Sequence, residues 1–370
     1  MQNPSTQQIT AILDNFQLEG LFHEINPISS GHIHSSFLVT FNSVIDPQKF
    51  ILQRVNTHVF PESEPLINNI RLVTDHLRKQ VASRGKNSAT CVVEMIPTQE
   101  GDFLLKQPNG DLWRMFTNID HADTFELVEN EKQVYQAGLA IGDFIFSLAD
   151  FPVEQLIDTI PMFHHTPSRF KDFLAVMKAD RIGRAQEVRE EIGFVLERQE
   201  ITAALVNMLD SGELPLRVIH NDTKISNVLF DRQSGDSICM IDLDTVMPGT
   251  SLYDFGDAAR TMTATAAEDE RDLSLVDFNQ AYFEKLTAGF IHGMQDSLTP
   301  GELKMIPESA ILMTLECGIR FLGDFLDGDR YFHTEYDDHN LVRARVQFKL
   351  VERMEANLDF MHNAVKLLVP

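Results

Sequence analysis

Apolar residues in the first part of the chain fall into short runs that predict strands. Three such runs, separated by Gly31 and by the turn signal IDPQ, predict three antiparallel strands between residues 22 and 54. Helical spacing of apolar positions predicts a short helix that ends near Phe16 and a longer one over residues 65–82. Three further strand-like runs follow, two of them joined by the hairpin turn PNGD: 91–97, 102–107 and 112–119. This part of the chain therefore predicts a small sheet with one inserted helix.

After His121 the apolar positions take on helical spacing almost throughout. They predict helices over the following ranges: 129–149, 167–180, 185–208, 274–294, 302–327 and 340–367. The exception is residues 217–245, where VLFD and SICMIDLD flank a turn at Ser234-Gly235-Asp236 and predict a hairpin. The expected fold class is α+β. We expect a sheet-rich N-terminal lobe over residues 1–118, which covers a nucleotide, and a larger, mainly helical lobe over residues 119–370.

The predicted hairpin gathers polar residues at one end. In RVIHNDTKISNVLFD, residues 217–231, Asp222 and Asn227 precede the first strand, and Asp242 stands at the far end of the second. Antiparallel pairing returns Asp242 to the loop beside Asn227, and Asp244 is a further candidate for the same place. Oxygen ligands of this kind suit Mg²⁺, which takes one or two carboxylates together with substrate phosphates and water. Asp222 then stays free to accept a proton from a substrate hydroxyl.

This order of residues is that of a kinase catalytic loop, H-x-D-x-x-x-x-N, followed by a metal-binding Asp. Here it consists of His220, Asp222, Asn227 and Asp242. Each fragment alone is weak evidence, but their combination behind a sheet-rich lobe favours a kinase over a polar turn with capping residues. Lys224 either screens the transferring phosphate or is simply solvated.

The segment ISSGHIHSSFLV lies between the first two predicted strands. Its backbone N–H groups and hydroxyls can cover the phosphates of a nucleotide, as a glycine-rich loop does in kinases. Ser30, Gly31 and His32 are therefore candidate nucleotide-binding residues. The alternative for this segment is a plain hairpin turn.

Composition narrows the class of protein. With 43% apolar and 23% charged residues, the 370-residue chain has the profile of a soluble globular protein. A formal charge of 31 − 55 = −24 argues against nucleic acid and anionic membranes as partners. The chain has no apolar run of membrane-spanning length, and MQNPSTQQIT lacks the regions of a signal peptide. Three scattered cysteines favour a reducing compartment, so we expect a cytoplasmic protein. No oligomeric state is predicted.

Several longer motifs resemble the aminoglycoside phosphotransferase and choline kinase superfamily, and within it the N-acetylhexosamine 1-kinases. The likeness covers nearly the whole chain, and the motifs HNDTK, IDLDTVMPG and ECGIRFL are its narrowest part. The resemblance implies a bilobal, protein-kinase-like fold. It also implies that ATP with Mg²⁺ phosphorylates the anomeric hydroxyl of N-acetylglucosamine or N-acetylgalactosamine, giving the sugar 1-phosphate.

The resemblance also implies roles for individual residues. Asp222 corresponds to the catalytic base, and Asn227 and Asp242 to the metal ligands. His220 and Asp254, the latter in YDFGD, correspond to supports of the catalytic loop. Arg320 and Tyr331 correspond to residues that contact the sugar.

Other interpretations of the sugar-site residues exist. Glu316, Arg320 and Asp324 are four apart on a predicted helix, which alone suggests a surface ion-pair ladder. Tyr331 can equally be a packed aromatic residue. The adjacent histidines at 164 and 165 precede a helix start, where surface or capping roles are the more common ones.

One departure from the kinase pattern concerns phosphate anchoring. Kinases place a Lys on the third strand to hold the α- and β-phosphates. Here FILQRV has Gln53 and Arg54 instead, which makes Gln53 a candidate nucleotide-binding residue.

Three alternative functions stay open at this point. The first is a kinase for an aminoglycoside, choline or another small alcohol; the charge of −24 suits a cationic acceptor, whereas ECGIRFL favours a neutral sugar. The second is a non-catalytic ATP-binding module, which the intact catalytic and metal-binding positions argue against. The third is a metal-dependent phosphohydrolase, which leaves the HNDTKISN loop unexplained.

Overall fold

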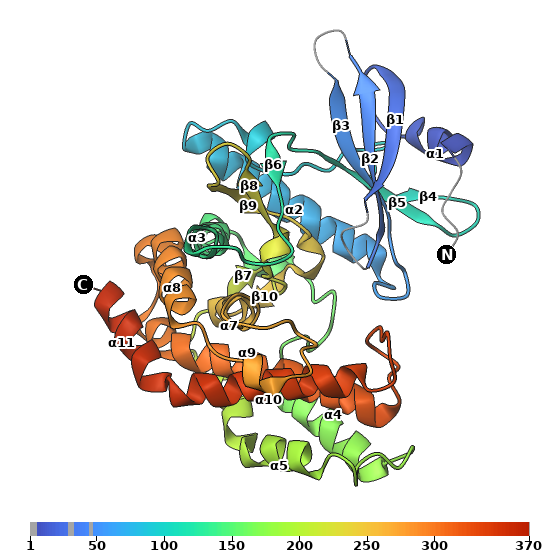
Figure 1. The fold of residues 1–370 in the computed structure, drawn as a ribbon. Helices are drawn as coiled ribbons and strands as arrows, with labels where there is room; N and C mark the ends of the chain where they lie inside the picture. Colours follow the sequence, from blue (N-terminus) through green and yellow to red (C-terminus); the bar gives the residue numbers. More distant parts are fainter. Residues whose placement is uncertain (1–5, 29–32, 44–46, 370) are drawn as a thin grey trace.

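An N-terminal sheet lobe stands above a larger helical C-terminal lobe (Figure 1). The structure is a computed structural model that describes residues 6–28, 33–43 and 47–369. This arrangement confirms the predicted α+β fold class. The boundary between residues 118 and 119 stays a prediction. Within the described part of the chain, no helix is long and apolar enough to cross a membrane.

The N-terminal sheet has five antiparallel strands in the order β1-β2-β3-β5-β4. Its strands are β1 Leu21–Ile28, β2 Ser35–Asn42, β3 Gln48–Arg54, β4 Leu105–Lys106 and β5 Leu112–Thr117. The three strands expected between residues 22 and 54 are confirmed. The strand expected over 91–97 is wrong, because this segment contributes only an isolated bridge from Met95 to Phe116. Its apolar residues Val92 and Met95 are instead buried in the large core of the molecule.

The two faces of this sheet contact different parts of the molecule. Successive side chains of a strand point to opposite faces. One face, which includes Val39, Leu52 and Trp113, forms a small core with helix α1 (Thr6–Leu13). The opposite face lines a cleft and has Gln53 on β3 directly across from Arg114 on β5.

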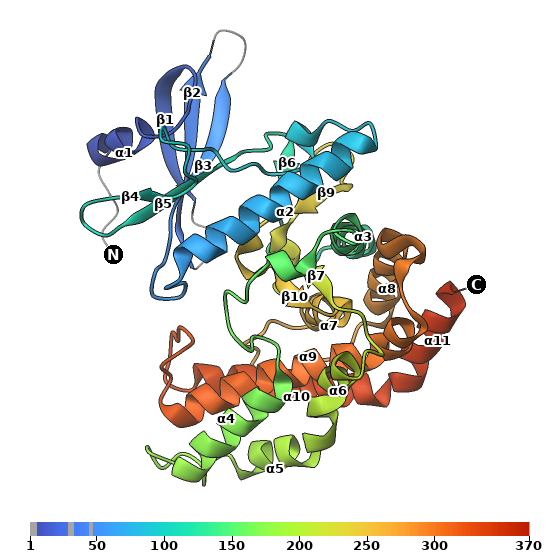
Figure 2. The ribbon, with the colours of Figure 1, turned by 180° about the vertical axis from the view of Figure 1, so that it is seen from behind.

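Helix α2, Ser63–Ser83, connects the two lobes. It confirms the helix predicted over 65–82, and its apolar stripe is buried in the same core as the C-terminal helices. The buried Asn69 Nδ2 donates to the carbonyls of Ile157 and Val246, at 2.8 and 3.2 Å. Figure 2 shows α2 running from the sheet across the top of the helical lobe.

The C-terminal lobe is built from nine α-helices in the described part of the chain. They are α3 Glu131–Ser147, α4 Thr166–Ala179, α5 Arg189–Glu197, α6 Ala204–Asp210, α7 Ser251–Met262, α8 Gln280–Met294, α9 Pro300–Asp327, α10 His339–Ala356 and α11 Leu358–Leu368. The single helices expected over 185–208 and 340–367 are each divided, the second at Asn357. Helix α7 was not predicted, and the structure buries it on almost every side.

Two small sheets hold the segment with the kinase-like motif. The predicted hairpin is confirmed as β8 Val228–Asp231 and β9 Ser237–Met240, and Gly235 in its turn has a φ of 71°. Strand β6, Ala122–Asp123, pairs with β8. A second sheet pairs β7 Arg217–Ile219 with β10 Met247–Gly249. The loops after β7 and after β9 therefore meet at the cleft between the lobes.

Candidate active site

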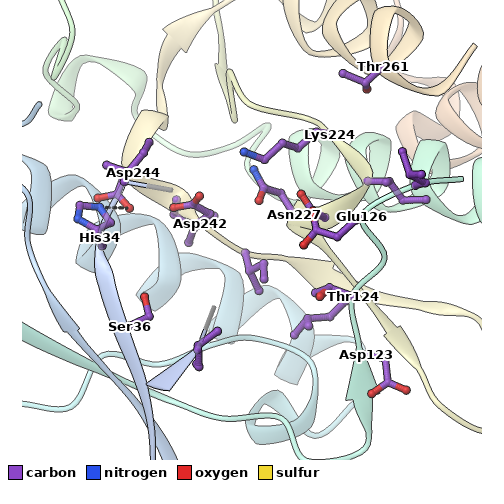
Figure 3. A pocket seen from close by; sticks show the side chains of 18 of the residues that line it. His34, Ser36, Asp123, Thr124, Glu126, Lys224, Asn227, Asp242, Asp244 and Thr261 are labelled. Carbon is purple, nitrogen blue, oxygen red and sulfur yellow. Dashed lines mark ion pairs between the residues drawn. The ribbon is translucent and has the colours of Figure 1, made fainter. Parts of the chain in front are cut away.

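A cleft of about 790 Å³ separates the sheet lobe from the hairpin β8–β9. Its apolar end is lined from above by β3 and β5 side chains, Ile51 and Phe116, and from below by Leu229 and Ile241. Its polar end contains Lys224, Asn227 and Asp242, which point into one part of the cleft (Figure 3). An apolar slot beside a polar end is a suitable shape for a nucleotide.

The loop after β7 is held by a buried carboxylate of α7. Asp254 accepts the backbone N–H groups of His220 and Asn221, both at 2.7 Å. Burial raises the pKa of Asp254 to about 7, although these two N–H groups oppose the rise. The His220 ring contacts the carbonyl of Ile241 at 2.8 Å, which ties the loop to the end of β9. His220 and Asp254 therefore lie where supports of the loop were expected.

Asp222 lies in the middle of a polar group. The Asn227 Nδ2 donates to its Oδ2 at 2.9 Å and to its carbonyl at 2.8 Å. The Lys224 Nζ lies 3.1 Å from the same carboxylate. Burial disfavours the Lys224 ammonium, but the charges of Asp222 and Asp242 outweigh it and raise the Lys224 pKa. Of the two interpretations of Lys224, the structure favours a residue engaged in the cleft over a merely solvated one.

Asp242 follows β9 with a left-handed backbone conformation, φ 62°. Burial, followed by the charges of Asp244 and Asp222, raises its pKa to about 7. Among the described residues, no Lys or Arg forms an ion pair with the Asp242 carboxylate, whereas Asp244 and Asp222 each have one. A buried carboxyl in this state is stabilised in its ionised form by a nearby cation.

These residues fit a magnesium ion that is shared with phosphates. Among residues 6–28, 33–43 and 47–369, no three His, Cys, Asp or Glu side chains form a metal cage by themselves. Mg²⁺ does not require such a cage, because it is commonly held by one or two protein oxygens, substrate phosphates and water. The Asp242 carboxylate and the amide oxygen of Asn227 supply that kind of ligand set.

Asp244, the further metal candidate, is engaged elsewhere. The Arg114 Nη1 and Nη2 donate to its two carboxylate oxygens at 2.5 and 2.7 Å. The His34 Nε2 lies 3.5 Å from Asp244 Oδ2. Burial opposes ionisation, but Arg114 and His34 hold the Asp244 pKa well below its usual range. The structure therefore favours Asp242 and Asn227 over Asp244 as metal ligands, because an arginine of the sheet lobe donates to both oxygens of Asp244.

Gln53 faces the cleft, as expected of a nucleotide-site residue. Its Oε1 accepts from Arg114 Nε at 2.9 Å, and its Nε2 donates to Ser36 Oγ at 3.0 Å. The other candidates for the nucleotide-covering loop, Ser30, Gly31 and His32, lie outside the described residues.

Arg320 on α9 has an unusual environment. Its guanidinium carbon lies over three aromatic rings, those of Phe163, Tyr331 and Phe332, at 5.4, 5.8 and 5.5 Å. It has no hydrogen bond or ion pair with any other residue that the structure describes. Tyr331 is 68% exposed, so the interpretation of Tyr331 as a packed aromatic residue is wrong.

The ion-pair ladder suggested for α9 does not form. Glu316 is buried and accepts from His164 Nδ1 at 2.8 Å and from Thr166 Oγ1 at 2.5 Å. Asp324 turns the other way and accepts the backbone N–H groups of three consecutive residues, 330 to 332, each at 2.9 Å. Asp324 thus holds the loop that carries Tyr331 over Arg320.

His164 is a site residue that the sequence did not reveal. It is buried, and its Nε2 contacts the carbonyl of Asn221 at 3.2 Å while its Nδ1 contacts Glu316. It therefore links α9 to the residue that precedes Asp222. The expectation of a surface or capping histidine holds for His165, whose ring accepts the N–H of Ser168, but is wrong for His164. The sequence signal was weak, because two adjacent histidines before a helix do not show which one turns inward.

Arg114 is the second site residue that was missed. It lies in LWRMFT, where the alternation of strand side chains puts it on the same face as Phe116. A charged residue inside an otherwise apolar strand was the available signal. Its partner Asp244 lies 130 positions further along the chain, which no local pattern indicates.

Known proteins are similar to this chain both in sequence family and in fold. Residues 24–289 match a family model described as phosphotransferase enzyme family. A choline kinase from Cryptosporidium parvum Iowa II is similar in structure, with a TM-score of 0.59 and 16% identity over 96% of this chain and 97% of that one. A spectinomycin phosphotransferase solved with ADP and spectinomycin gives a TM-score of 0.58 at 12% identity over 97% and 99%.

A microcompartment-associated aminopropanol kinase is also similar, with a TM-score of 0.56 and 15% identity over 97% of this chain and 99% of that one. At such low identities the likeness shows the fold alone. The kinase-like fold that the sequence motifs implied is thereby confirmed.

Proposed function

Because the chain belongs to the phosphotransferase enzyme family, we propose that it transfers the γ-phosphoryl group of ATP to the anomeric hydroxyl of an N-acetylhexosamine. The acceptor is N-acetylglucosamine or N-acetylgalactosamine, and the product is the sugar 1-phosphate. Asp222 is the catalytic base, and Asn227 and Asp242 hold Mg²⁺.

The shape of the cleft supports ATP as the donor. The adenine fits the apolar slot beside the connection at residues 116–121, and the phosphates extend towards Asn227 and Asp242. Asn227 and Asp242 would hold Mg²⁺ at this end of the cleft, where the ion would supply neutralisation of the charge that develops during transfer. A structurally similar spectinomycin phosphotransferase was solved with ADP, which agrees with this choice of donor.

The hydrogen bonds around Asp222 support its role as base. The Asn227 amide fixes the carboxylate by donating to it at 2.9 Å, and the Lys224 ammonium lies 3.1 Å from it. The sugar hydroxyl oxygen attacks the γ-phosphorus while its proton passes to Asp222. The bond from that phosphorus to the bridging oxygen breaks, and ADP leaves with the electron pair. Since the C1–O bond of the sugar stays intact, the anomer keeps its configuration.

The unpaired guanidinium of Arg320 is the observation that carries the choice of acceptor. A cationic acceptor such as choline or an aminoglycoside requires carboxylates or an aromatic cage free of positive charge. Here Arg320 occupies the aromatic group. Arg169 is a second cation near Arg320. Burial lowers the pKa of the Arg169 guanidinium, and the positive charge of Arg320 lowers it further. Glu316, one helical turn before Arg320, is already bound by His164 and Thr166. A neutral sugar with hydroxyl and amide oxygens satisfies Arg320 without charge repulsion.

The test is phosphoryl transfer to a panel of acceptors. The protein is incubated with Mg·ATP and N-acetylglucosamine, N-acetylgalactosamine, glucose, galactose, choline or kanamycin, and phosphorus NMR locates the new phosphate. Phosphate on the anomeric oxygen of an N-acetylated sugar is the expected result. Phosphate on choline or kanamycin would contradict the proposed acceptor and leave the proposed kinase activity intact. Binding of ATP without transfer to any acceptor would indicate a non-catalytic module, for which Gln53 at the position of the kinase lysine is the one argument.

A further inference from the structure

A buried ion pair joins the two lobes beside the proposed metal site. Arg114 of β5 grips both carboxylate oxygens of Asp244, and the side chains are 1% and 4% exposed. Asp244 belongs to the short turn Leu243–Thr245 that immediately follows Asp242. The sheet lobe therefore holds the turn that presents Asp242.

Arg114 is itself held by a row of polar side chains across the sheet. Ser36, Gln53 and Arg114 lie on three adjacent strands, and the strand register places them side by side. Arg114 Nε donates to Gln53 Oε1 at 2.9 Å, and Gln53 Nε2 donates to Ser36 Oγ at 3.0 Å. This row fixes the guanidinium plane, which a two-pronged grip on a carboxylate requires. Gln53 stands where kinases place their lysine.

The turn is also attached to the loop after β7, because Thr245 Oγ1 donates to the His220 carbonyl at 2.7 Å and Asn221 Nδ2 donates to the Thr245 carbonyl at 2.8 Å. Around Asp244 itself the further contacts are fewer. His34 approaches Asp244 at 3.5 Å, and the Thr159 hydroxyl donates to its backbone carbonyl at 3.2 Å. Arg114 is also the only Lys or Arg that the described part of the sheet lobe contributes to the lining of the cleft. With its side chain 1% exposed, it is covered too well to touch a nucleotide itself.

We propose that Arg114 is a positioning residue for the nucleotide site. It acts through Asp244 on the turn and thereby on Asp242. The inference rests on the proposed function in one respect, that Asp242 is a ligand of the nucleotide-bound Mg²⁺. A buried ion pair is often no more stabilising than apolar residues of the same size, so a role in binding is a better account of this pair than stability.

The test measures ADP binding by calorimetry with and without Mg²⁺. For Arg114→Gln we expect Mg·ADP affinity to fall by roughly 10- to 100-fold, the usual effect of losing a residue that orients a metal ligand. Affinity for metal-free ADP should change less than about twofold, since the apolar slot is untouched. Arg114→Lys should recover only part of the loss, because a single ammonium cannot grip two oxygens in a plane.

Arg54→Gln is the matched control. Arg54 lies one position from Gln53 on the opposite face of β3, against Trp113. The Arg54→Gln substitution should leave the affinities for Mg·ADP and for metal-free ADP unchanged. If Arg114→Gln does not fold, the double variant Arg114→Met with Asp244→Leu replaces the pair by apolar side chains of similar size and tests the same point.

The outcomes separate the two proposals. A folded Arg114→Gln or double variant that binds Mg·ADP like the wild type overturns the positioning role and leaves the kinase proposal intact. Equal losses of ADP affinity with and without Mg²⁺ also contradict the positioning role, since they indicate general damage to the cleft. A wild-type protein that binds ADP no better with Mg²⁺ than without overturns the metal site, and the positioning role with it.

Discussion

At the scale of single residues, Asp222 carries the sharpest prediction. Asp222→Asn keeps the shape of the side chain but removes the group that accepts the proton. Turnover should fall by about 10²- to 10⁴-fold, the usual contribution of a general base. Affinity for Mg·ADP should change little. Asp236→Asn, at an exposed turn of the hairpin β8–β9, is the control. Turnover of Asp222→Asn near the wild-type value would remove Asp222 from the mechanism.

Arg320 tests the acceptor site. Arg320→Leu removes the unpaired guanidinium, and hydrogen bonds to a charged group contribute about 1.5–3 kcal/mol. The KM for the sugar should therefore rise at least about tenfold, and the KM for ATP should stay the same. Arg330→Leu is matched in type and lies on the loop beside Tyr331, with a side chain that is 61% exposed. Steady-state kinetics with each substrate varied in turn give the answer. Equal KM values for the sugar in both variants would contradict the assignment.

The predictability of site residues depended on how local their signal is. Asp222, Asn227 and Asp242 share one stretch of chain, so spacing and the pairing of a hairpin were sufficient to bring them together. Arg114 and His164 act through partners 130 and 152 positions away. Such contacts depend on the packing of whole elements, which a local pattern does not contain.

At the scale of elements, α3 and α8 pack more closely than side chains normally allow. Gly138 and Gly142 on α3 face Gly289 and Gly293 on α8, and each glycine lies against the backbone of the other helix. Both pairs have the spacing G-x-x-x-G, which permits such an approach. The sequence shows these glycines plainly, but only the packing of the two helices gives them a meaning.

Gly289→Ala should therefore destabilise the protein. Its new methyl group would collide with the carbonyl oxygen of Tyr135, and overpacking of this kind costs about 1–3 kcal/mol. Gly323→Ala in α9 is the control, because nothing lies within 4 Å of its new methyl group. That change should stabilise by up to about 1 kcal/mol through helix propensity. Urea unfolding distinguishes them, and equal midpoints for the two variants would contradict the close approach.

Helix α7 is an element that the pattern of apolar and polar positions in the sequence did not lead us to predict. Its sequence SLYDFGDAARTM is buried on almost all sides, including Asp254 and Asp257. Periodicity detects a helix through the contrast between a buried and an exposed face. In α7 the polar positions are buried as well as the apolar ones, because Asp254 and Asp257 accept backbone N–H groups of the loop after β7 instead of facing water.

At the scale of the whole molecule, Glu302 ties several parts of the C-terminal lobe together. Its fully buried carboxylate accepts from Arg217 of β7 at 2.7 and 2.8 Å and from Ser251 of α7 at 2.6 Å. It also closes the start of α9 by accepting the backbone N–H of Thr299 at 2.8 Å. Burial opposes ionisation, but Arg217 and Ser251 lower the Glu302 pKa below 4.5.

Lowering the pH should remove the stabilisation of the folded state that the Glu302 carboxylate provides. A carboxylate whose pKa is lowered by folding stabilises the folded state fully above its unfolded pKa, and the effect is lost as pH falls through the folded pKa. Glu302→Gln leaves Arg217 without a countercharge and should cost about 3 kcal/mol at pH 7. The difference from wild type should shrink as pH falls below 4.5. Urea unfolding over that range measures it, and a difference independent of pH would show that the ion pair is not its source.

The composition of the cleft has a consequence for covalent labelling. Reagents built on ATP that acylate amines near the phosphates react with a lysine that lines the site. Among the described residues that line this cleft, the only lysine is Lys224, which lies on its floor beside Asp222. Peptide mapping after labelling should find the adduct on Lys224, and Lys224→Arg should abolish it. A probe whose reactive group points at the roof should leave this protein unmarked while it labels kinases that keep the third-strand lysine.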